Sequence, residues 1–268
     1  MPFEEYYRYF RQWMEPGMEP EHERARRRFE STLLFFKNQK VSASSVLDLC
    51  AGTGIAGAAA AKAFSASKLT LVDVRKEDLE KVREWLGIAE VNPELRLVAG
   101  DVLQLPELVE EHDLAVLWGH TMPHFDPFDA VRLFSGVASV LDEGGYFFIE
   151  EPDRIGRFLY NRMYRDFTVE RTGAETIVSI HEGYDVRRGV ERRGYYILPG
   201  FKKMAEMELR AWDLASLLAI GRIFFRDANL ITPSEHGVSG VSEVLVFRRP
   251  KRRIAGEVYS EFQSFTRV

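Results

Sequence analysis

The fold is decided by residues 46–57, which read VLDLCAGTGIAG. The apolar start of this stretch predicts a buried strand, and its glycines predict a tight turn into a helix whose first N–H groups lack main-chain partners. Gly52, Gly54 and Gly57 have the spacing with which nucleotide-binding folds hold a pyrophosphate. Asp48 ends the strand just before these glycines, and its negative charge would repel a pyrophosphate but attract a cationic amino group. We therefore expect a ligand with such an amino group at this turn.

The chain on either side of this turn alternates between short apolar runs and amphipathic stretches. This alternation predicts a parallel sheet covered by helices, which is an α/β fold. We expect strands at 45–50, 69–73, 95–99, 113–118 and 145–150, and helices at 55–65, 77–86, 106–111 and 127–141. Ligands of open α/β sheets bind beyond the carboxyl ends of the strands. The ends of these strands are therefore the candidate site.

Acids also end the second and third of these strands, at Asp73 and Asp101. A carboxylate at Asp73 can accept hydrogen bonds from the hydroxyls of a ribose. One at Asp101 can accept from the exocyclic amine of adenine, while Val102 offers its N–H. Either acid alone could instead be a loop carboxylate or a helix cap. Together with Asp48 at the same edge of the sheet, they predict an adenosine-containing ligand.

The rest of the chain predicts helices before the sheet and a β-rich insertion within it. We expect helices at 3–14, 20–38, 153–167 and 212–222, a hairpin of strands at 175–185 and 189–199, and strands at 203–211, 223–231 and 242–248. The chain is accordingly divided into an N-terminal helical cap (1–40), a ligand-binding core (41–152), a helix and β insertion (153–211), the completion of the core sheet (212–250) and a tail (251–268).

The string DLCAGTG at residues 48–54, with Asp73 and Asp101 at the next two strand ends, resembles the class I S-adenosylmethionine-dependent methyltransferases. Cys50 departs from the pattern, because the family usually has glycine there. The resemblance implies a Rossmann-like seven-stranded sheet with an antiparallel last strand, and inserted strands that cover the substrate. It also implies that S-adenosylmethionine is the cofactor, bound by Asp48, Cys50, Ala51, Gly52, Gly54, Asp73, Val74, Asp101, Val102, Trp118, Gly119 and His120.

The fourth expected strand opens into GHTMPHF at residues 119–125. This segment is similar to the Gly-Asn-Ser-x-x-His-Leu segment of small-molecule methyltransferases, namely the glycine and sarcosine N-methyltransferases and the amino-sugar N-methyltransferases. The resemblance implies that it passes under the methionine part of the cofactor and faces the substrate. His120 replaces the usual asparagine, so a preference for amines does not carry over. Pro123 interrupts any helix that would bring His120 and His124 together as metal ligands, so we expect no metal.

The resemblance implies an enzyme that moves the methyl group of S-adenosylmethionine, in line, onto a nitrogen or oxygen of a small-molecule acceptor. A nitrogen acceptor needs little beyond a neutral nitrogen, whereas a hydroxyl acceptor needs a base. His120, His124 and Glu150 are the candidate catalytic residues for that role. Three alternatives stay open: a protein that binds S-adenosylmethionine without transferring its methyl group, a methyltransferase for RNA or protein, and a nucleotide-dependent dehydrogenase.

The composition limits the partners and the cellular setting. A net charge of -5 disfavours nucleic acid as a partner, because phosphate contacts supply most of that affinity. No apolar run approaches the roughly 20 residues that cross a bilayer, and a single cysteine excludes an internal disulfide, so we expect a cytoplasmic protein without a membrane partner. Asn and Gln occur four times each against 29% charged residues, a balance often found in proteins from thermophiles. A homo-oligomer is compatible with the sequence.

Overall fold

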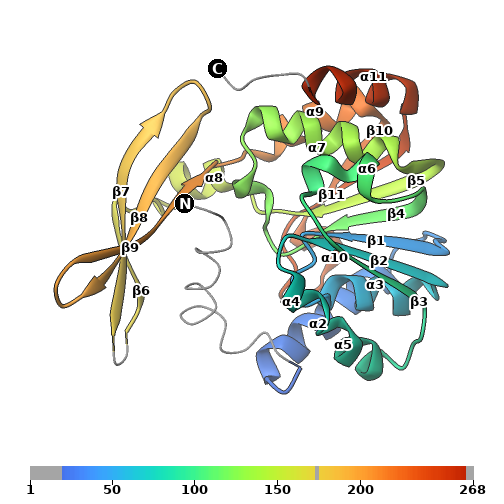
Figure 1. Ribbon diagram of the computed structural model, residues 1–268, viewed down its shortest axis with the longest axis horizontal. Coiled ribbons are helices and arrows are strands. Elements are labelled where there is room, and N and C mark those ends of the chain that lie inside the picture. Colours follow the sequence, from blue (N-terminus) through green and yellow to red (C-terminus); the bar gives the residue numbers. More distant parts are fainter. Residues whose placement is uncertain (1–19, 173–174, 264–268) are drawn as a thin grey trace.

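The computed structural model describes residues 20–172 and 175–263, which form two β-sheets on either side of a cavity. Figure 1 shows a large sheet with helices on both faces, and a small sheet that stands beyond one end of its strands. The large sheet has seven strands in the order β10-β11-β5-β4-β1-β2-β3. These strands are β1 (Ser45–Leu49), β2 (Lys68–Asp73), β3 (Glu94–Ala99), β4 (His112–Leu117), β5 (Leu141–Glu150), β10 (Phe225–Ile231) and β11 (Val244–Pro250).

The strands β1 to β5 run parallel to one another, whereas β11 is antiparallel to both β5 and β10. The chain builds β2 and β3 on one side of β1 and then returns to place β4 on the other side. The carboxyl ends of β1 and β4 therefore flank a topological switch point, which is where open α/β sheets bind ligands. This topology confirms the expected Rossmann-like seven-stranded sheet with an antiparallel last strand.

Helices cover both faces of the large sheet (Figure 1). One face packs against α2 (Glu23–Lys37), α3 (Ile55–Phe64), α4 (Lys76–Leu79) and α5 (Val82–Ala89), and the other against α6 (Leu105–Leu108), α7 (Pro127–Ser139), α9 (Leu214–Phe224) and α11 (Arg252–Gln263). Alternate residues of β1 supply the two cores, since Val46 packs toward α3 and Leu47 toward α7. A run of buried alanines, residues 58–61, lets α3 lie close to the sheet and to α2.

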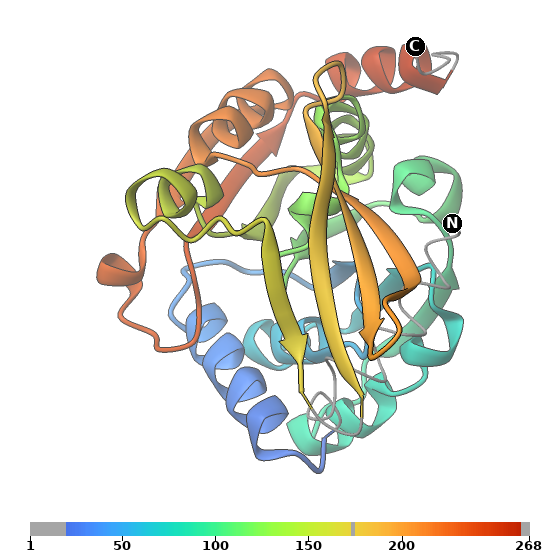
Figure 2. The same cartoon turned by 90° about the vertical axis from the view of Figure 1, so that its left-hand side faces the viewer.

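The small sheet has four antiparallel strands in the order β6-β7-β8-β9. They are β6 (Phe167–Arg171), β7 (Thr176–Asp185), β8 (Val190–Leu198) and β9 (Lys202–Leu209), and α8 (Arg154–Tyr160) leads into them. Figure 2 looks onto this sheet, with the core behind it. The buried Trp212 ties the sheet to the core, because its indole N–H donates to the carbonyls of Met122 and Phe125 at 3.1 and 3.0 Å. The N–H of Arg210 donates to the carbonyl of Pro123 at 2.8 Å.

The structure corrects the sequence expectation in two places. The expected hairpin is present as β7 and β8, and the expected strand at 203–211 as β9, but the insertion has a fourth strand, because the expected helix at 153–167 ends at Tyr160 and residues 167–171 form β6. Residues 252–263 of the expected tail form α11, whose buried Ala255 and Tyr259 lie one helical turn apart and pack on α7. The expected helix at 3–14 lies outside the described residues. None of the helices in the described ranges combines the length and the hydropathy that a bilayer span requires.

Candidate active site

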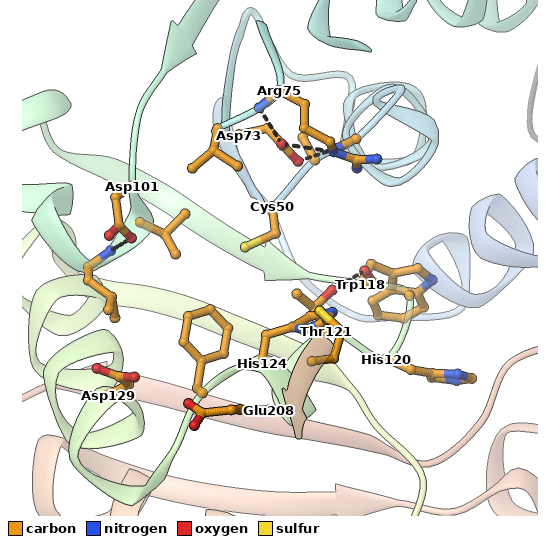
Figure 3. A pocket seen from close by; sticks show the side chains of 18 of the residues that line it. Cys50, Asp73, Arg75, Asp101, Trp118, His120, Thr121, His124, Asp129 and Glu208 are labelled. Atoms are coloured by element: carbon orange, nitrogen blue, oxygen red, sulfur yellow. Dashed lines mark hydrogen bonds and ion pairs between the residues drawn. The ribbon is translucent and has the colours of Figure 1, made fainter. Parts of the chain in front are cut away.

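A cavity of about 1180 Å³ lies between the carboxyl ends of the large sheet's strands and the small sheet. At the large sheet it is lined by Cys50, Ala51, Gly52, Asp73, Val74, Asp101, Val102, Trp118, Gly119 and His120. Figure 3 shows several of these side chains converging from the ends of different strands. Of the twelve residues expected to bind the cofactor, Asp48 and Gly54 do not line the cavity.

Asp48 faces away from the cavity, contrary to the role expected of its charge. Its side chain is buried beneath the glycine turn, and Oδ2 accepts a hydrogen bond from the N–H of Gly57 at 2.7 Å. Burial raises the pKa of Asp48 to about 8, so the carboxyl group is mostly protonated at neutral pH. The structure therefore does not place a negative charge of Asp48 at the cavity wall, where it could select an amino group over a pyrophosphate. Asp48 instead holds the start of α3 against β1.

Gly54 lies in the turn on the side away from the cavity, facing Val82. Its φ of 82° lies in the left-handed region, and a Cβ at this position would stand 2.5 Å from a methyl carbon of Val82. Cys50 also has a left-handed φ, 51°, which explains why glycine is usual at this position of the family pattern. The Cys50 side chain points into the cavity (Figure 3). Desolvation raises the pKa of its thiol, so the group is a neutral, small lining residue rather than a nucleophile.

Asp73 links the end of β2 to the glycine turn. Its Oδ2 accepts from the N–H of Gly52 at 2.8 Å, and its Oδ1 accepts from the N–H of Arg75 at 2.8 Å and from Arg75 Nε at 3.2 Å. Arg75 also pairs with the buried Asp78, with Nη1 and Oδ2 3.1 Å apart. The carboxylate of Asp73 thus lines the cavity and orders the loops around it at the same time.

Asp101 and Val102 form the third strand end. Asp101 is exposed to the cavity, and its Oδ1 caps the short helix η1 (Val102–Gln104) by accepting from the N–H of Leu103 at 2.9 Å. The two roles weighed for this acid, a helix cap and a cavity residue, therefore occur together. Val102 is buried, with its apolar side chain against the same wall.

Glu150, a candidate base in the sequence, is a buried acid that does not line the cavity. Its side chain is fully buried and is absent from the cavity wall. Oε2 pairs with Arg28 and accepts from the N–H of Gly119 at 3.1 Å, and Oε1 accepts from the N–H of Ser242 at 3.1 Å. Glu151, the next residue, is equally buried and pairs with Arg154. The partners of Glu150 come from α2 and from the loop before β11, which explains why its burial could not be seen locally.

His120 and His124 both line the cavity, but they face different surroundings. His120 has a left-handed φ of 63°, and its Nε2 lies 3.0 Å from the hydroxyl of Ser242. Figure 3 shows its ring directed away from His124. His124 lies in the short helix η2 (Met122–His124), between the strand ends of the large sheet and the small sheet. Burial lowers the pKa of His124 to about 4, so its ring is neutral at physiological pH.

Inserted strands over the substrate were expected from the resemblance, but the residues at the far end of the cavity were not foreseen. It is lined by Phe125, Asp126, Asp129, Arg188, Val190, Lys203, Glu206, Met207 and Glu208. Arg188, in the turn between β7 and β8, pairs with Asp126 at 2.8 Å and with Glu208 at 2.5 Å. Arg28 also lines the cavity, although the cluster at residues 26–28 looks like a solvated helix face in the sequence. These residues converge only after folding, so their positions along the chain carried no signal.

Comparisons with known proteins identify the core of this structure. Residues 46–145 match the family model of a methyltransferase domain. No curated protein matches the chain. The fold is similar to that of the PH0226 protein of Pyrococcus horikoshii OT3, with 20% identity and a TM-score of 0.61 over 93% of this chain and 100% of that one. It is also similar to the sugar N-methyltransferase KedS8 of Streptoalloteichus, with 15% identity and a TM-score of 0.54 over 83% and 86% of the chains.

A third similar structure contains bound S-adenosylmethionine. This protein is CalS10, an amino pentose methyltransferase of Micromonospora echinaspora, with 15% identity and a TM-score of 0.51 over 84% of this chain and 90% of that one. The seven-stranded sheet has the fold of these methyltransferases, and its first five strands lie in or overlap the part of the chain that matches a methyltransferase domain, residues 46–145. The family match and the shared fold support an S-adenosylmethionine-dependent methyltransferase. This finding decides against the dehydrogenase alternative.

Proposed function

We propose that this enzyme transfers the methyl group of S-adenosylmethionine to a nitrogen or oxygen of a small polar molecule. The observation that carries the proposal is a single cavity with two chemically distinct ends. One end holds the glycine turn and the acids of the strand ends, and the other is walled by β8 and β9. Its volume of about 1180 Å³ exceeds the roughly 300–1,000 Å³ of a pocket for one drug-sized ligand. The cavity therefore has room for a cofactor and a small acceptor together.

The residues at the large sheet fit the cofactor. Small side chains at residues 50–52 leave the main chain open to close approach, and the carboxylates of Asp73 and Asp101 are acceptors for ribose hydroxyls and an adenine amine. Arg28, which pairs with Glu150, also lines the cavity, and its guanidinium suits the carboxylate of a methionine moiety. When bound there, S-adenosylmethionine supplies a methyl group on a positively charged sulfur.

His124 is the residue placed to act on the acceptor. Its ring is neutral at physiological pH because burial holds its pKa at about 4. A ring with so low a pKa removes a hydroxyl proton poorly, since a general base works best with a pKa near the operating pH. We therefore assign His124 to accept a hydrogen bond from the acceptor and to orient its lone pair toward the cofactor end. Holding two reacting atoms about 3 Å apart can by itself lower a barrier by several kcal/mol.

The far wall favours a small polar acceptor over RNA. Asp126, Asp129, Glu206 and Glu208 outnumber Arg188 and Lys203 there, and a surplus of carboxylates repels a phosphate backbone. The similar structures described as a sugar N-methyltransferase and an amino pentose methyltransferase support the same class of acceptor.

A methyl-transfer screen tests the proposal. The enzyme is incubated with S-adenosylmethionine carrying a labelled methyl group and with small amines, amino sugars and polyols, or with total RNA and mixed protein. We expect label in the small-molecule fraction only. Label confined to RNA or protein contradicts the proposal, and cofactor binding with no transfer to any acceptor class supports the non-catalytic alternative.

The His124→Ala variant tests the assigned role. It should lower kcat at least ~10-fold, since a positioning contact is lost, while the Kd for S-adenosylmethionine stays unchanged. His181→Ala is the matched control, because His181 lies on β7 outside the cavity wall. Equal activity of the two variants removes His124 from the site.

A further inference from the structure

Arg75 lies over the carboxylate that the family pattern assigns to the ribose. It follows β2 by two residues, lines the cavity, and folds back so that its Nε reaches Asp73 (Figure 3). Arg75 is not one of the residues that the resemblance implies. Its position next to Asp73 raises the question of how one carboxylate can hold both ribose hydroxyls while it also holds this arginine.

The hydrogen-bonding capacity of Asp73 is nearly used up. A carboxylate offers about four lone-pair sites on its two oxygens. Oδ1 accepts two hydrogen bonds, from the main-chain N–H and from Nε of Arg75, and Oδ2 accepts one, from the N–H of Gly52. With the partners that residues 20–172 and 175–263 supply, one site is left, on Oδ2. Asp73 can therefore accept from one ribose hydroxyl in this arrangement, and the second hydroxyl needs another partner.

The guanidinium of Arg75 is held beside that remaining site. Asp78, whose side chain is 1% exposed, pairs with Nη1 at 3.1 Å, and Asp73 pairs with Nε at 3.2 Å. These two acids fix the plane of the guanidinium from two sides. Nη2 lies at the glycine turn, since a Cβ on Gly52 would be 2.9 Å from it. A cationic donor is thus fixed between the end of β2 and the turn that approaches the cofactor.

We propose that Asp73 and Arg75 bind the ribose of S-adenosylmethionine as a pair. Asp73 Oδ2 accepts a hydrogen bond from one hydroxyl, and the Arg75 guanidinium donates to the oxygen of the other. A ribose hydroxyl can be donor or acceptor, so the diol matches an acceptor and a donor placed side by side. Arg75 is then a cofactor-binding residue that helps to determine specificity for the ribose. The proposal rests on the cofactor assignment and is independent of the methyl acceptor.

Binding of ribose-modified ligands tests the pair. Calorimetry measures the Kd of S-adenosylhomocysteine and of its 2′-deoxy and 3′-deoxy analogues for the wild type, Arg75→Ala and Arg75→Lys. In the wild type we expect each deoxy analogue to bind ~10-fold more weakly or worse, because a buried charged partner loses its hydrogen bond. In Arg75→Ala we expect one of the two penalties to disappear and the other to remain. Arg75→Lys, which keeps the charge without the planar fork, should restore that penalty only in part.

The same measurements separate a binding role from a merely structural one. A structural arginine would weaken all three ligands equally and leave both deoxy penalties in place, which overturns the proposal. Tighter binding of S-adenosylhomocysteine by Arg75→Ala also overturns it, because Asp73 would then hold both hydroxyls once the arginine is gone. Arg83→Ala is the control, since Arg83 is an exposed arginine of the neighbouring helix α5 that pairs only with Glu80 among the described residues. Failure of the wild type to bind S-adenosylhomocysteine would reject the cofactor site itself, which is a different result.

Discussion

Asp48 and Asp73 are both buried acids at strand ends, but only Asp73 meets the cavity. Asp48 is held in its mostly protonated form by burial, with a pKa of about 8 against 3.8 in the unfolded chain. Between these pH values the native state retains a proton that the unfolded chain has released. Stability therefore falls as the pH rises from 4 to 8, by roughly 1.4 kcal/mol per pH unit at most for this group.

The Asp48→Asn variant should lose this pH dependence and keep the cofactor site. Asparagine offers the same acceptor to the N–H of Gly57 and has no proton to release. We expect its free energy of unfolding, relative to the wild type, to increase between pH 5 and pH 8 in urea titrations. S-adenosylhomocysteine should still bind, whereas Asp73→Asn, the matched change at the cavity, should weaken binding. Loss of binding by Asp48→Asn would show that an ionised Asp48 contacts the cofactor after all.

Gly54 and Gly87 make a matched pair of helix-associated glycines with opposite surroundings. A Cβ on Gly54 would require a left-handed backbone and would stand 2.5 Å from Val82, whereas a Cβ on Gly87 in α5 meets nothing within 4 Å. We expect Gly54→Ala to destabilise the protein by about 2 kcal/mol or more. Gly87→Ala should stabilise it by up to about 1 kcal/mol. Thermal and urea unfolding measure both effects, and similar values for the two variants would contradict the tight turn at Gly54.

At the scale of elements, Arg188 links the small sheet to the core through two ion pairs. It pairs with Asp126, the N-cap of α7, and with Glu208 on β9. Its loss would leave the buried Asp126 without its charged partner and would loosen the wall of β8 and β9 beside His124. For Arg188→Ala we expect the KM for the acceptor to rise roughly tenfold, as for one lost charged contact, with the Kd for S-adenosylmethionine unchanged. Arg187→Ala, at an exposed position of the same turn, serves as the control. Equal KM values in the two variants would contradict a role of the Arg188 ion pairs in acceptor binding.

The elements also show which parts of the site could be predicted from the sequence. The glycine turn and the acids of β2 and β3 lie within a few residues of strand ends, so their place at one edge of the sheet follows from hydrophobic periodicity. The direction of Asp48 could not be predicted, because both faces of β1 are buried and alternation does not mark the side that meets the ligand. Glu150 was misplaced because its partners come from α2 and the loop before β11. The far end of the cavity is lined by residues from η2, α7 and β9, which only the tertiary fold brings together.

At the scale of the whole molecule, the two ends of the cavity belong to different sheets. The cofactor end is built on β1 to β4, and the far end on β8, β9 and α7. The link between them is the segment from Met122 to Asp126, which receives hydrogen bonds from Trp212 and Arg210 and an ion pair from Arg188. This segment also carries His124. The contact with the acceptor that we propose for His124 would thus be fixed relative to both sheets by one short stretch of chain.

Because the two ends of the cavity lie on different sheets, we can predict which amides the cofactor protects from hydrogen exchange. S-adenosylhomocysteine should slow amide exchange locally at residues 50–57, 73–78 and 101–104, because these turns surround the cofactor end. Any ligand of the native state also slows exchange that requires global unfolding, by mass action. The comparison therefore uses the earliest time points, at which exposed turns exchange through local opening. Protection there should spare β8 and β9, and NAD should protect neither region. Protection centred on residues 190–209 would instead place the cofactor at the wall that we assign to the acceptor.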